Sequence, residues 1–555
     1  MQFDFKTQPY AHQLAQFERH KDAEHFALFN DMGTGKTKIV IDIAAYKYVH
    51  GLIDAVLIIA PNHVHEQWIK EQFPLHCSVI YRHVTWSASR YSTKHWREYW
   101  NDFCSEPMPF LKVFSVNVEA FQSNSVVPFI AEYVQTNRTF IVIDEATRIK
   151  HHTAKRTKVI HKLNKYGQRA ILTGTPTAKS PFDLWSMMEF LQANYFQCNF
   201  FVFQHRYGVL IKGVNGQTGA QFNTLIDQKQ FNLVKSKIQY MKEDRGGQLQ
   251  PNDYEALAAI TGTSEKNVRF IETQETFTRF KRLDELKEFI AKDVSSVRKE
   301  DCLDLPPKVY EKIFVDMTKE QKQVYNDLRK TYLAQYADKE LTVQNKVSLT
   351  TRLMQIVGGF FPYTGQEERI DGKFHYMADI AKAEPIGSAN TKLRAIIDDM
   401  EETSEDTQLI IWAHFVPELK MLYAEMSKLY TCALYYGGTS NNERENIKRD
   451  FIAGKYRIFI GNTATAGFGL NLQCSTLQYF YSNTFMTEER LQSEDRSHRI
   501  GVKGTVVYKD IIMKGTIDER IYENITAGRN LNDYFKDVSV KELFAEIEME
   551  DEDAQ

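Results

Sequence analysis

Cysteine is scarce in this sequence, and long apolar runs are missing. The six cysteines among 555 residues lie far apart, without metal-ligand spacing, and are interpreted as reduced structural thiols. The longest apolar stretches, such as residues 55–60, are the length of a strand and far too short to cross a bilayer. Residues 1–4 show no basic region followed by an apolar one, as a signal peptide would. These absences predict a protein without a membrane partner, cytoplasmic or, in a eukaryote, nuclear.

A surplus of positive charge is missing as well. The formal net charge is −3 and the pI is about 6.6, which is not the overall electrostatic signature of a nucleic-acid-binding protein. A nucleic-acid role would therefore have to rest on local clusters and motifs. Hydrophobic residues make up 43% and charged residues 25%, the mix of an ordinary globular protein with a sizeable core.

What the chain does contain is short, β-branched apolar runs separated by amphipathic stretches. Residues 55–60 and 140–143 have the character of buried parallel strands. A second pattern of the same kind begins at 409–412 and 458–460. The alternation predicts an α/β protein in which the same architecture is used twice.

Changes in composition divide the chain further. Gly and Gln become frequent and apolar runs weaken after about residue 196, and a capping box of Thr318 and Gln321 precedes apolar residues at four-residue spacing (Val324, Leu328, Tyr332, Tyr336). The predicted domains are an α/β lobe at 1–195, an inserted, partly helical module at 196–305, a second α/β lobe at 306–530 with a helical insertion at about 318–390, and an acidic C-terminal tail at 531–555.

The strongest local signal is a glycine-rich loop before an amphipathic stretch. It reads Asp31-Met32-Gly33-Thr34-Gly35-Lys36-Thr37. In such a loop, backbone N–H groups surround phosphate oxygens at the N-terminus of a helix. Lys36 would reach the β and γ phosphates, and the Thr37 hydroxyl would hold Mg²⁺. The usual pattern starts with Gly, where this chain has Asn30, so a glycine turn with an incidental lysine is the alternative for the loop alone.

Two acidic residues follow the apolar run at 140–143. Carboxylates at the end of a buried strand are costly unless they serve a purpose. Asp144 would bind Mg²⁺, and Glu145 would orient and deprotonate an attacking water. The alternative is a solvated turn, which the upstream phosphate loop disfavours.

A polar cluster near the C-terminus contains two arginines three residues apart, Arg496 and Arg499, which we expect on one helical face. Planar guanidinium groups suit the charge that develops on a γ-phosphate. A salt-bridged surface helix is the alternative. The other members of the cluster are Gln492, Asp495, His498 and Gly501.

Two weaker clusters have simpler explanations. Basic residues after Glu145 could meet phosphates but more often form a solvated face (Arg148, Lys150, Lys155, Arg156, Lys158). Aromatic residues at the start of the inserted module could stack on bases but more often belong to a core (Phe196, Phe200, Phe201, Phe203, Tyr207).

Taken in order, these motifs resemble the SWI/SNF-type branch of the superfamily 2 helicase-like ATPases, over residues 10–522. Gln13 matches the adenine-recognising glutamine, 31–37 the phosphate loop, 57–68 motif Ia, 144–150 motif II and 172–176 motif III. In the second half, 410–415, 465–472 and 492–501 resemble motifs IV, V and VI, and 305–308 and 514–520 are typical of this branch. One departure is Thr147, where the family has His or Gln, in a position thought to couple the ATP site to the motor.

The resemblance implies two RecA-like lobes with ATP and Mg²⁺ in the cleft between them. The implied catalytic residues are Lys36, Asp144, Glu145, Arg496 and Arg499; the nucleotide-binding residues are Gln13, Gly33, Thr34, Gly35, Lys36, Thr37, Gly467, Gly469 and Gln492; and the metal ligands are Thr37 and Asp144. It also implies a DNA-dependent ATPase that tracks along double-stranded DNA and remodels or displaces DNA-bound structures. A strand-separating or annealing DNA or RNA helicase, and a DNA-binding scaffold with a degenerate ATP site, are the alternatives.

Overall fold

The protein is described by a computed structural model over residues 3–62, 64–105, 109–123, 125–174, 180–214, 221–336, 343–361, 367–370, 373–376, 383–466, 470–499 and 501–527. The chain forms two compact units, Met1–Leu303 and Asp304–Gln555. Within the described ranges, no helix is long and apolar enough to cross a membrane.

Unit 1 is built on a parallel sheet of seven strands in the order β3-β4-β2-β5-β6-β1-β9. Its central strands are the apolar runs of the sequence, and every residue of Ala55–Ala60 and Thr139–Ile143 is buried. The strands are β1 (His25–Leu28), β2 (Ala55–Ala60), β3 (Tyr81–Thr85), β4 (Leu111–Asn117), β5 (Thr139–Ile143), β6 (Gln168–Leu172) and β9 (Val294–Ser295).

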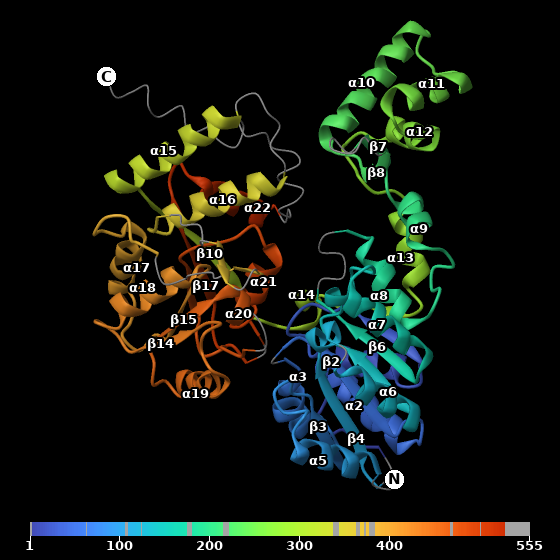
Figure 1. Ribbon diagram of the computed structural model, residues 1–555, viewed down its shortest axis with the longest axis vertical. Coiled ribbons are helices and arrows are strands. Elements are labelled where there is room, and N and C mark those ends of the chain that lie inside the picture. Colours follow the sequence, from blue (N-terminus) through green and yellow to red (C-terminus); the bar gives the residue numbers. More distant parts are fainter. Residues whose placement is uncertain are drawn as a thin grey trace. The chain divides into compact units, whose positions relative to one another are not determined.

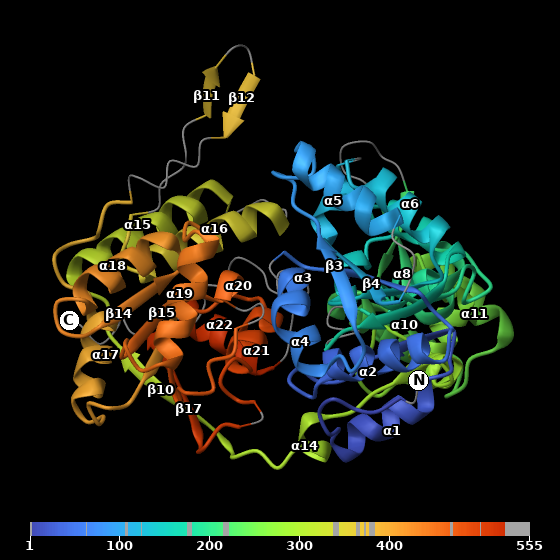
Figure 2. The ribbon, with the colours of Figure 1, turned by 90° about the horizontal axis from the view of Figure 1, so that it is seen from below.

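Helices cover both faces of this sheet, because successive side chains of a strand point to opposite sides. Leu57 and Ile59 pack into one core with α5–α8, whereas Val56 and Ile58 pack into another with α2 and the segment from Trp68 to Phe73. Figure 2 shows α2 and α6 on opposite sides of β3 and β4. The helices are α1 (Ala11–His20), α2 (Lys36–Val49), α3 (Val64–Gln67), α4 (Phe73–His76), α5 (Lys94–Ser105), α6 (Val127–Thr136), α7 (Lys155–His161) and α8 (Asp183–Leu191), with a π-helical turn at Trp68–Gln72.

After α8 the chain leaves the sheet and forms a small module with its own core before it returns at β9 (Figure 1). That core joins Val209 and Ile211 to Phe231, Val234 and residues of the two following helices. The elements between α8 and β9 are α9 (Phe200–Tyr207), β7 (Leu210–Val214), β8 (Gln221–Leu225), α10 (Gln228–Asp244), α11 (Pro251–Thr261), α12 (Glu265–Thr273) and α13 (Leu283–Ile290), and α14 (Lys299–Cys302) follows β9. β7 and β8 form an antiparallel hairpin.

Unit 2 is built on a second parallel sheet, of six strands in the order β10-β17-β16-β13-β15-β14. Leu409 and Ile411 face one core, and Ile410 and Trp412 face the other. The strands are β10 (Lys308–Val315), β13 (Leu409–Ala413), β14 (Cys432–Tyr435), β15 (Ile458–Asn462), β16 (Leu477–Phe480) and β17 (Val506–Met513), and a separate hairpin comprises β11 (Glu367–Ile370) and β12 (Lys373–Tyr376). The two sheets confirm the prediction of an α/β protein with two RecA-like lobes.

The helices of unit 2 are α15 (Lys319–Tyr336), α16 (Val343–Val357), α17 (Thr391–Glu401), α18 (Val416–Met426), α19 (Asn441–Ile452), α20 (Thr463–Ala466), α21 (Thr487–Glu494) and α22 (Ile517–Thr526). The predicted capping box is confirmed at the start of α15. The Gln321 backbone N–H donates to the Thr318 hydroxyl, and the Thr318 backbone N–H donates to the Gln321 side chain, both at 3.2 Å. Helix insertions therefore interrupt the second lobe before β13.

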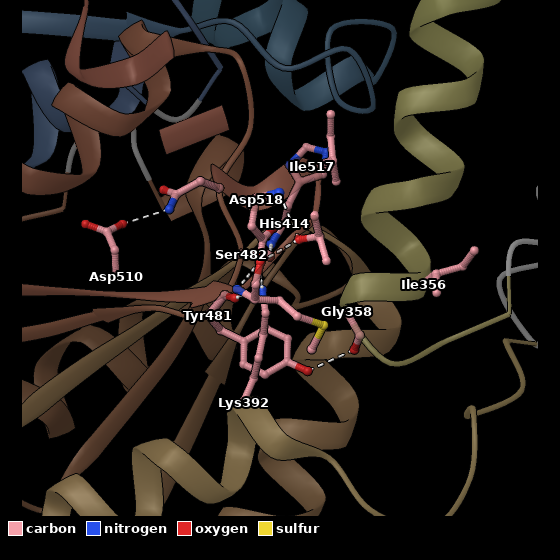
Figure 3. A network of polar contacts seen from close by, with 12 residues as sticks. Ile356, Gly358, Lys392, His414, Tyr481, Ser482, Asp510, Ile517 and Asp518 are labelled. Atoms are coloured by element: carbon pink, nitrogen blue, oxygen red, sulfur yellow. Dashed lines mark hydrogen bonds and ion pairs between the residues drawn. The ribbon is translucent and has the colours of Figure 1, made fainter. Parts of the chain in front are cut away.

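A buried polar network connects these helices to β16 (Figure 3). Lys392 of α17 pairs with Asp518 of α22 at 2.5 Å and donates to the Tyr481 carbonyl oxygen at 3.0 Å. The Tyr481 hydroxyl donates to the Gly358 carbonyl oxygen at 2.8 Å. Because the charges are paired and hydrogen-bonded, their burial is tolerated and α16, α17 and α22 are held in register with the sheet.

Candidate nucleotide-binding site

The glycine-rich loop lies where the sequence predicts a phosphate loop, between the end of β1 and the start of α2. Gly33 and Gly35 have φ angles of +79° and +87°, a region that side chains disfavour. A Cβ at position 35 would lie 2.1 Å from Nε2 of Gln13. The loop therefore requires glycine at position 35 for both its backbone conformation and its packing.

Lys36 begins α2, and its ammonium group points back along the loop. It donates to the carbonyl oxygens of Asn30 at 2.8 Å and Asp31 at 3.1 Å. Asn30 is fully buried and exchanges two amide hydrogen bonds with Gln16 of α1, at 2.9 and 2.6 Å. The residue that departs from the usual glycine therefore has a structural partner, which the sequence analysis missed.

Gln13 lies against the same loop. Its Nε2 donates to the Thr34 carbonyl oxygen at 3.1 Å, and its Oε1 accepts from the Tyr10 backbone N–H at 3.0 Å. His12 forms a second hydrogen bond with the Thr34 carbonyl oxygen, at 2.8 Å. The Tyr10 side chain is 49% exposed beside these groups. The start of α1 thus places an amide, an imidazole and an aromatic ring at one side of the loop.

Asp144 and Glu145 follow β5 at the carboxyl edge of the same sheet. Asp144 is nine-tenths buried, and its Oδ2 accepts a hydrogen bond from Nε1 of Trp68 at 2.8 Å. Burial raises the pKa of the Asp144 carboxyl, while the Trp68 hydrogen bond and the charge of Lys36 oppose the rise. The charge of Lys36 therefore acts on a carboxyl that lies more than a hundred residues away in the sequence.

Glu145 adopts a left-handed backbone conformation, with a φ of +51°, and precedes a short 3-10 turn over Ala146–Ile149. Its backbone N–H donates to Asp144 Oδ1 at 3.0 Å. A non-glycine residue in this region stores strain, and such residues cluster at functional sites. Thr147, the departure from the resembled family, lies in this turn and is half-buried.

The residues that follow β6 lie beside the glycine-rich loop of unit 1. The Thr173 backbone N–H donates to the Leu28 carbonyl oxygen at 3.1 Å, and a Cβ on Gly174 would lie 2.9 Å from the Met32 side chain. The carboxyl ends of β1, β5 and β6 therefore bring the loop, the two acids and Gly174 to one edge, where α/β sheets bind ligands. Thr37, the second residue of α2, is half-buried beside Lys36.

In unit 2, Arg496 and Arg499 converge on one backbone group. Each donates from Nη1 to the Leu470 carbonyl oxygen, at 3.3 Å. The expectation that they share a helical face is wrong, because α21 ends at Glu494. The Leu472 backbone N–H donates to the Arg496 carbonyl oxygen at 2.9 Å and the Ser497 hydroxyl donates to the Leu472 carbonyl oxygen at 3.1 Å, so tertiary bonds hold the turn that follows α21.

The rest of the polar cluster holds this segment in place. Gln492 is buried in α21, and its carbonyl oxygen accepts a hydrogen bond from Nε of Arg496 at 2.8 Å. Asp495 lies 3.7 Å from Lys308, and His498 shares a 2.8 Å hydrogen bond with the Pro306 carbonyl oxygen. The predicted nucleotide-binding residues Gly467 and Gly469 lie outside the described residues.

Members of both weaker clusters have structural partners. Lys150 pairs with Asp183 at 3.6 Å, and Phe196, Phe203 and Tyr207 are buried in the core of unit 1. Phe201 is the exposed member of the aromatic cluster, at 58%. The described part of the chain contains no group of three or more His, Cys, Asp or Glu side chains able to hold a metal by themselves.

Comparison with known proteins assigns both halves of the chain. The SNF2-related domain matches residues 14–358, and the helicase conserved C-terminal domain matches residues 390–501. These matches span the phosphate loop and Asp144-Glu145 in one half and Arg496 and Arg499 in the other.

Among curated proteins, the chain is 23% identical to the ATP-dependent helicase fft1 of Schizosaccharomyces pombe, over 89% of this chain and 49% of that protein. It is 24% identical to the ATP-dependent helicase FUN30 of Saccharomyces cerevisiae, over 89% and 43% respectively. The chain thus spans about half the length of these relatives. A solved SWI2/SNF2 ATPase core from Sulfolobus solfataricus, in complex with dsDNA, aligns with all of this chain and 98% of its own, at 19% identity and a TM-score of 0.36. Since the first family match alone covers well over half of the 555 residues, the chain belongs to the SNF2-related family.

Proposed function

We propose that the protein is a DNA-dependent ATPase that translocates on double-stranded DNA and remodels or displaces structures bound to it. The observation that carries the ATPase part is the carboxyl edge of the unit 1 sheet, where the ends of β1 and β5 bring together the glycine-rich loop with Lys36 and the adjacent acids Asp144 and Glu145. A phosphate loop and a buried carboxylate within electrostatic reach of one another are what a nucleotide triphosphate with its metal requires.

The roles of individual residues follow from their positions. The backbone of Gly33, Thr34 and Gly35 would surround the phosphates, and Lys36 would exchange the Asn30 and Asp31 carbonyl oxygens for β and γ phosphate oxygens. Gln13 would recognise the adenine base, with the exposed Tyr10 ring beside it.

The residues also fit Mg²⁺. A hydroxyl on Thr37 and a buried carboxylate on Asp144, ordered by the Trp68 N–H, are oxygen donors of the kind the ion prefers. When bound, Mg²⁺ would neutralise charge on the phosphates. Glu145, held at the strained position next to Asp144, would orient the attacking water and accept its proton.

Arg496 and Arg499 would complete the site from unit 2. Their shared acceptor, the Leu470 carbonyl oxygen, holds both guanidinium groups close to one another. We propose that ATP draws the two lobes together, so that the guanidinium groups reach the γ-phosphate and stabilise the charge that develops there. Gly467, Gly469 and Gln492 are proposed to bind the nucleotide as well.

Duplex DNA is the proposed track because of family membership, and not because of bulk charge. With a net charge of −3, the protein must hold DNA through local basic surfaces, and binding should weaken steeply with salt because phosphate contacts release counterions. Base sequence should matter little to the motor itself, since a translocating enzyme must release every site it reaches.

The test is ATP turnover measured without nucleic acid and with double-stranded DNA, single-stranded DNA and RNA, together with displacement of a triplex-forming third strand. We expect stimulation by the duplex and third-strand displacement without strand separation. Lys36→Ala serves as the inactive control, because it removes the phosphate contact and leaves surface contacts with DNA in place. Stimulation by single strands or RNA alone would favour a helicase, and no response to any nucleic acid would leave an ATPase only.

A further inference from the structure

The module inserted after α8 contains two short helices joined by a tight turn. α11 ends at Thr261, α12 begins at Glu265, and the three residues between them include Gly262, with a φ of +68°. The Ser264 hydroxyl caps α12 by accepting from the Asn267 backbone N–H at 3.3 Å. Two helices joined by a three-residue turn that contains glycine have the connectivity of a helix-turn-helix.

The inner faces of these helices form a single core with α10. Leu257 and Ala258 of α11 and Val268 and Ile271 of α12 are buried together with Phe231 and Val234 of α10. Figure 1 shows the three helices grouped above β7 and β8. The angle between α11 and α12 is thus fixed by a common third helix, which is how a helix-turn-helix presents its second helix rigidly.

α12 is also hydrogen-bonded to the hairpin of β7 and β8. The buried Asn267 side chain donates to the Leu210 carbonyl oxygen of β7 at 2.9 Å and accepts from the Lys281 ammonium at 2.6 Å. The turn pairs with β7 as well, since the Lys212 backbone N–H donates to the Gly262 carbonyl oxygen at 2.7 Å. These bonds use the inner side of α12 and leave its outer side, with Ser264, Lys266 and Arg269, exposed to solvent.

Positive charge gathers around the exposed N-terminal half of α12. Burial and the neighbouring charges of Arg282 and Lys266 lower the pKa of Lys281 to about 8, so these cations lie close together. Lys212 is exposed beside the turn. Arg269 lies over the Tyr254 ring of α11 at 3.7 Å, which orients its guanidinium group. Glu265 is an acidic residue on this outer face. Glu272 forms an ion pair with Lys242 at 2.8 Å, which offsets its charge.

From this geometry we propose that α11 and α12 are a second DNA-binding site, in which α12 enters the major groove of duplex DNA. Lys266 and Arg269, exposed on the outer face near the start of α12, contact base edges or phosphates, as the N-terminal residues of the second helix do in this motif. Lys212 and Arg282, which are both exposed, contact the flanking phosphates. The site is separate from the ATP-driven lobes and gives the protein a preferred place to load on DNA.

The test uses the full chain and compares Lys266→Ala/Arg269→Ala with Lys229→Ala/Lys237→Ala. The control pair removes the same charge from exposed positions on α10, outside the turn and α12. We expect the first variant to bind duplex DNA about 10-fold more weakly or worse. The slope of log affinity against log salt should fall by about 2, as expected for two lost phosphate-equivalent contacts. Selection from a randomised duplex pool should enrich a short motif for the wild type and the control only.

Because Arg269 packs on Tyr254, Lys266→Glu provides a second variant that alters an exposed side chain alone and should also lose affinity. ATP turnover at saturating DNA should equal that of the wild type in all these variants, which separates this site from the motor. Affinity, salt slope and selected sequence equal to those of the control would overturn the proposal. If DNA did not stimulate the ATPase of the wild type, the proposed function would be overturned, but the proposal that α11 and α12 bind DNA would not.

Discussion

Replacing Trp68 by Phe should move the pH dependence of ATP hydrolysis. The Trp68 indole donates to Asp144 Oδ2 at 2.8 Å, in a site where Asp144 is nine-tenths buried and burial already raises the pKa of its carboxyl. A hydrogen bond to a charged group is worth about 1.5–3 kcal/mol, so losing it should raise the pKa of the Asp144 carboxyl further and disfavour its ionised form by roughly that much. Protonated Asp144 cannot bind Mg²⁺, so the acid limb of the rate profile should shift to higher pH.

The assay is turnover against pH at saturating ATP and at several Mg²⁺ concentrations. Trp100→Phe is the matched control, because Trp100 is equally buried in unit 1 and its indole donates to the Glu132 carboxylate at 3.0 Å, away from the loop. The control should keep the wild-type acid limb, and excess Mg²⁺ should partly restore Trp68→Phe at a given pH. An acid limb that stays in place in Trp68→Phe would refute the assignment of Asp144 as the ionised metal ligand.

Glu145→Gln should bind ATP normally and hydrolyse it orders of magnitude more slowly, as equilibrium binding and single-turnover measurements would show; lost nucleotide binding would mean a structural role instead. Arg499→Ala should slow turnover by roughly 10³-fold, with Arg496→Ala similar, by analogy with arginine fingers; unchanged turnover in both would exclude unit 2 from the site. Thr147→His should keep basal turnover and strengthen its stimulation by DNA, and a collapse of basal turnover would contradict this. Burial raises the pKa of Glu418 to about 7, so the folded protein favours the protonated carboxyl, and the stability that this form contributes is lost as pH rises toward 7. Glu418→Gln should therefore flatten the fall in melting temperature between about pH 5 and 7. An unaltered slope would assign that fall to other groups.

The strands and the loop could be predicted because their signals are local. Short β-branched runs became β2, β5, β13 and β15, and the glycine-rich loop lies between a strand and a helix as its pattern requires. A sequence window contains all the information that such features need.

The partners within the site could not be predicted, since they come from distant segments. Nothing near Asp144 in the sequence indicates that Trp68 orders it, and nothing near Asn30 indicates its amide pair with Gln16. The end of α21 at Glu494 could not be predicted for the same reason, because the turn that follows it is held by hydrogen bonds with Leu472, which lies outside the helix. The helix-turn-helix did carry a local signal, with Gly262 and Ser264 between two short amphipathic runs, but its inner face is defined by contact with α10.

The central claim is that duplex DNA drives ATP turnover at the Lys36–Asp144 edge of unit 1. The most direct measurement is the steady-state ATPase rate as a function of double-stranded DNA concentration, for the wild type and Lys36→Ala side by side. The account predicts a rate that rises and saturates with duplex in the wild type and stays at background in Lys36→Ala, while both bind the duplex. A wild-type rate indifferent to duplex, or a Lys36→Ala rate that rises with it, would contradict the account.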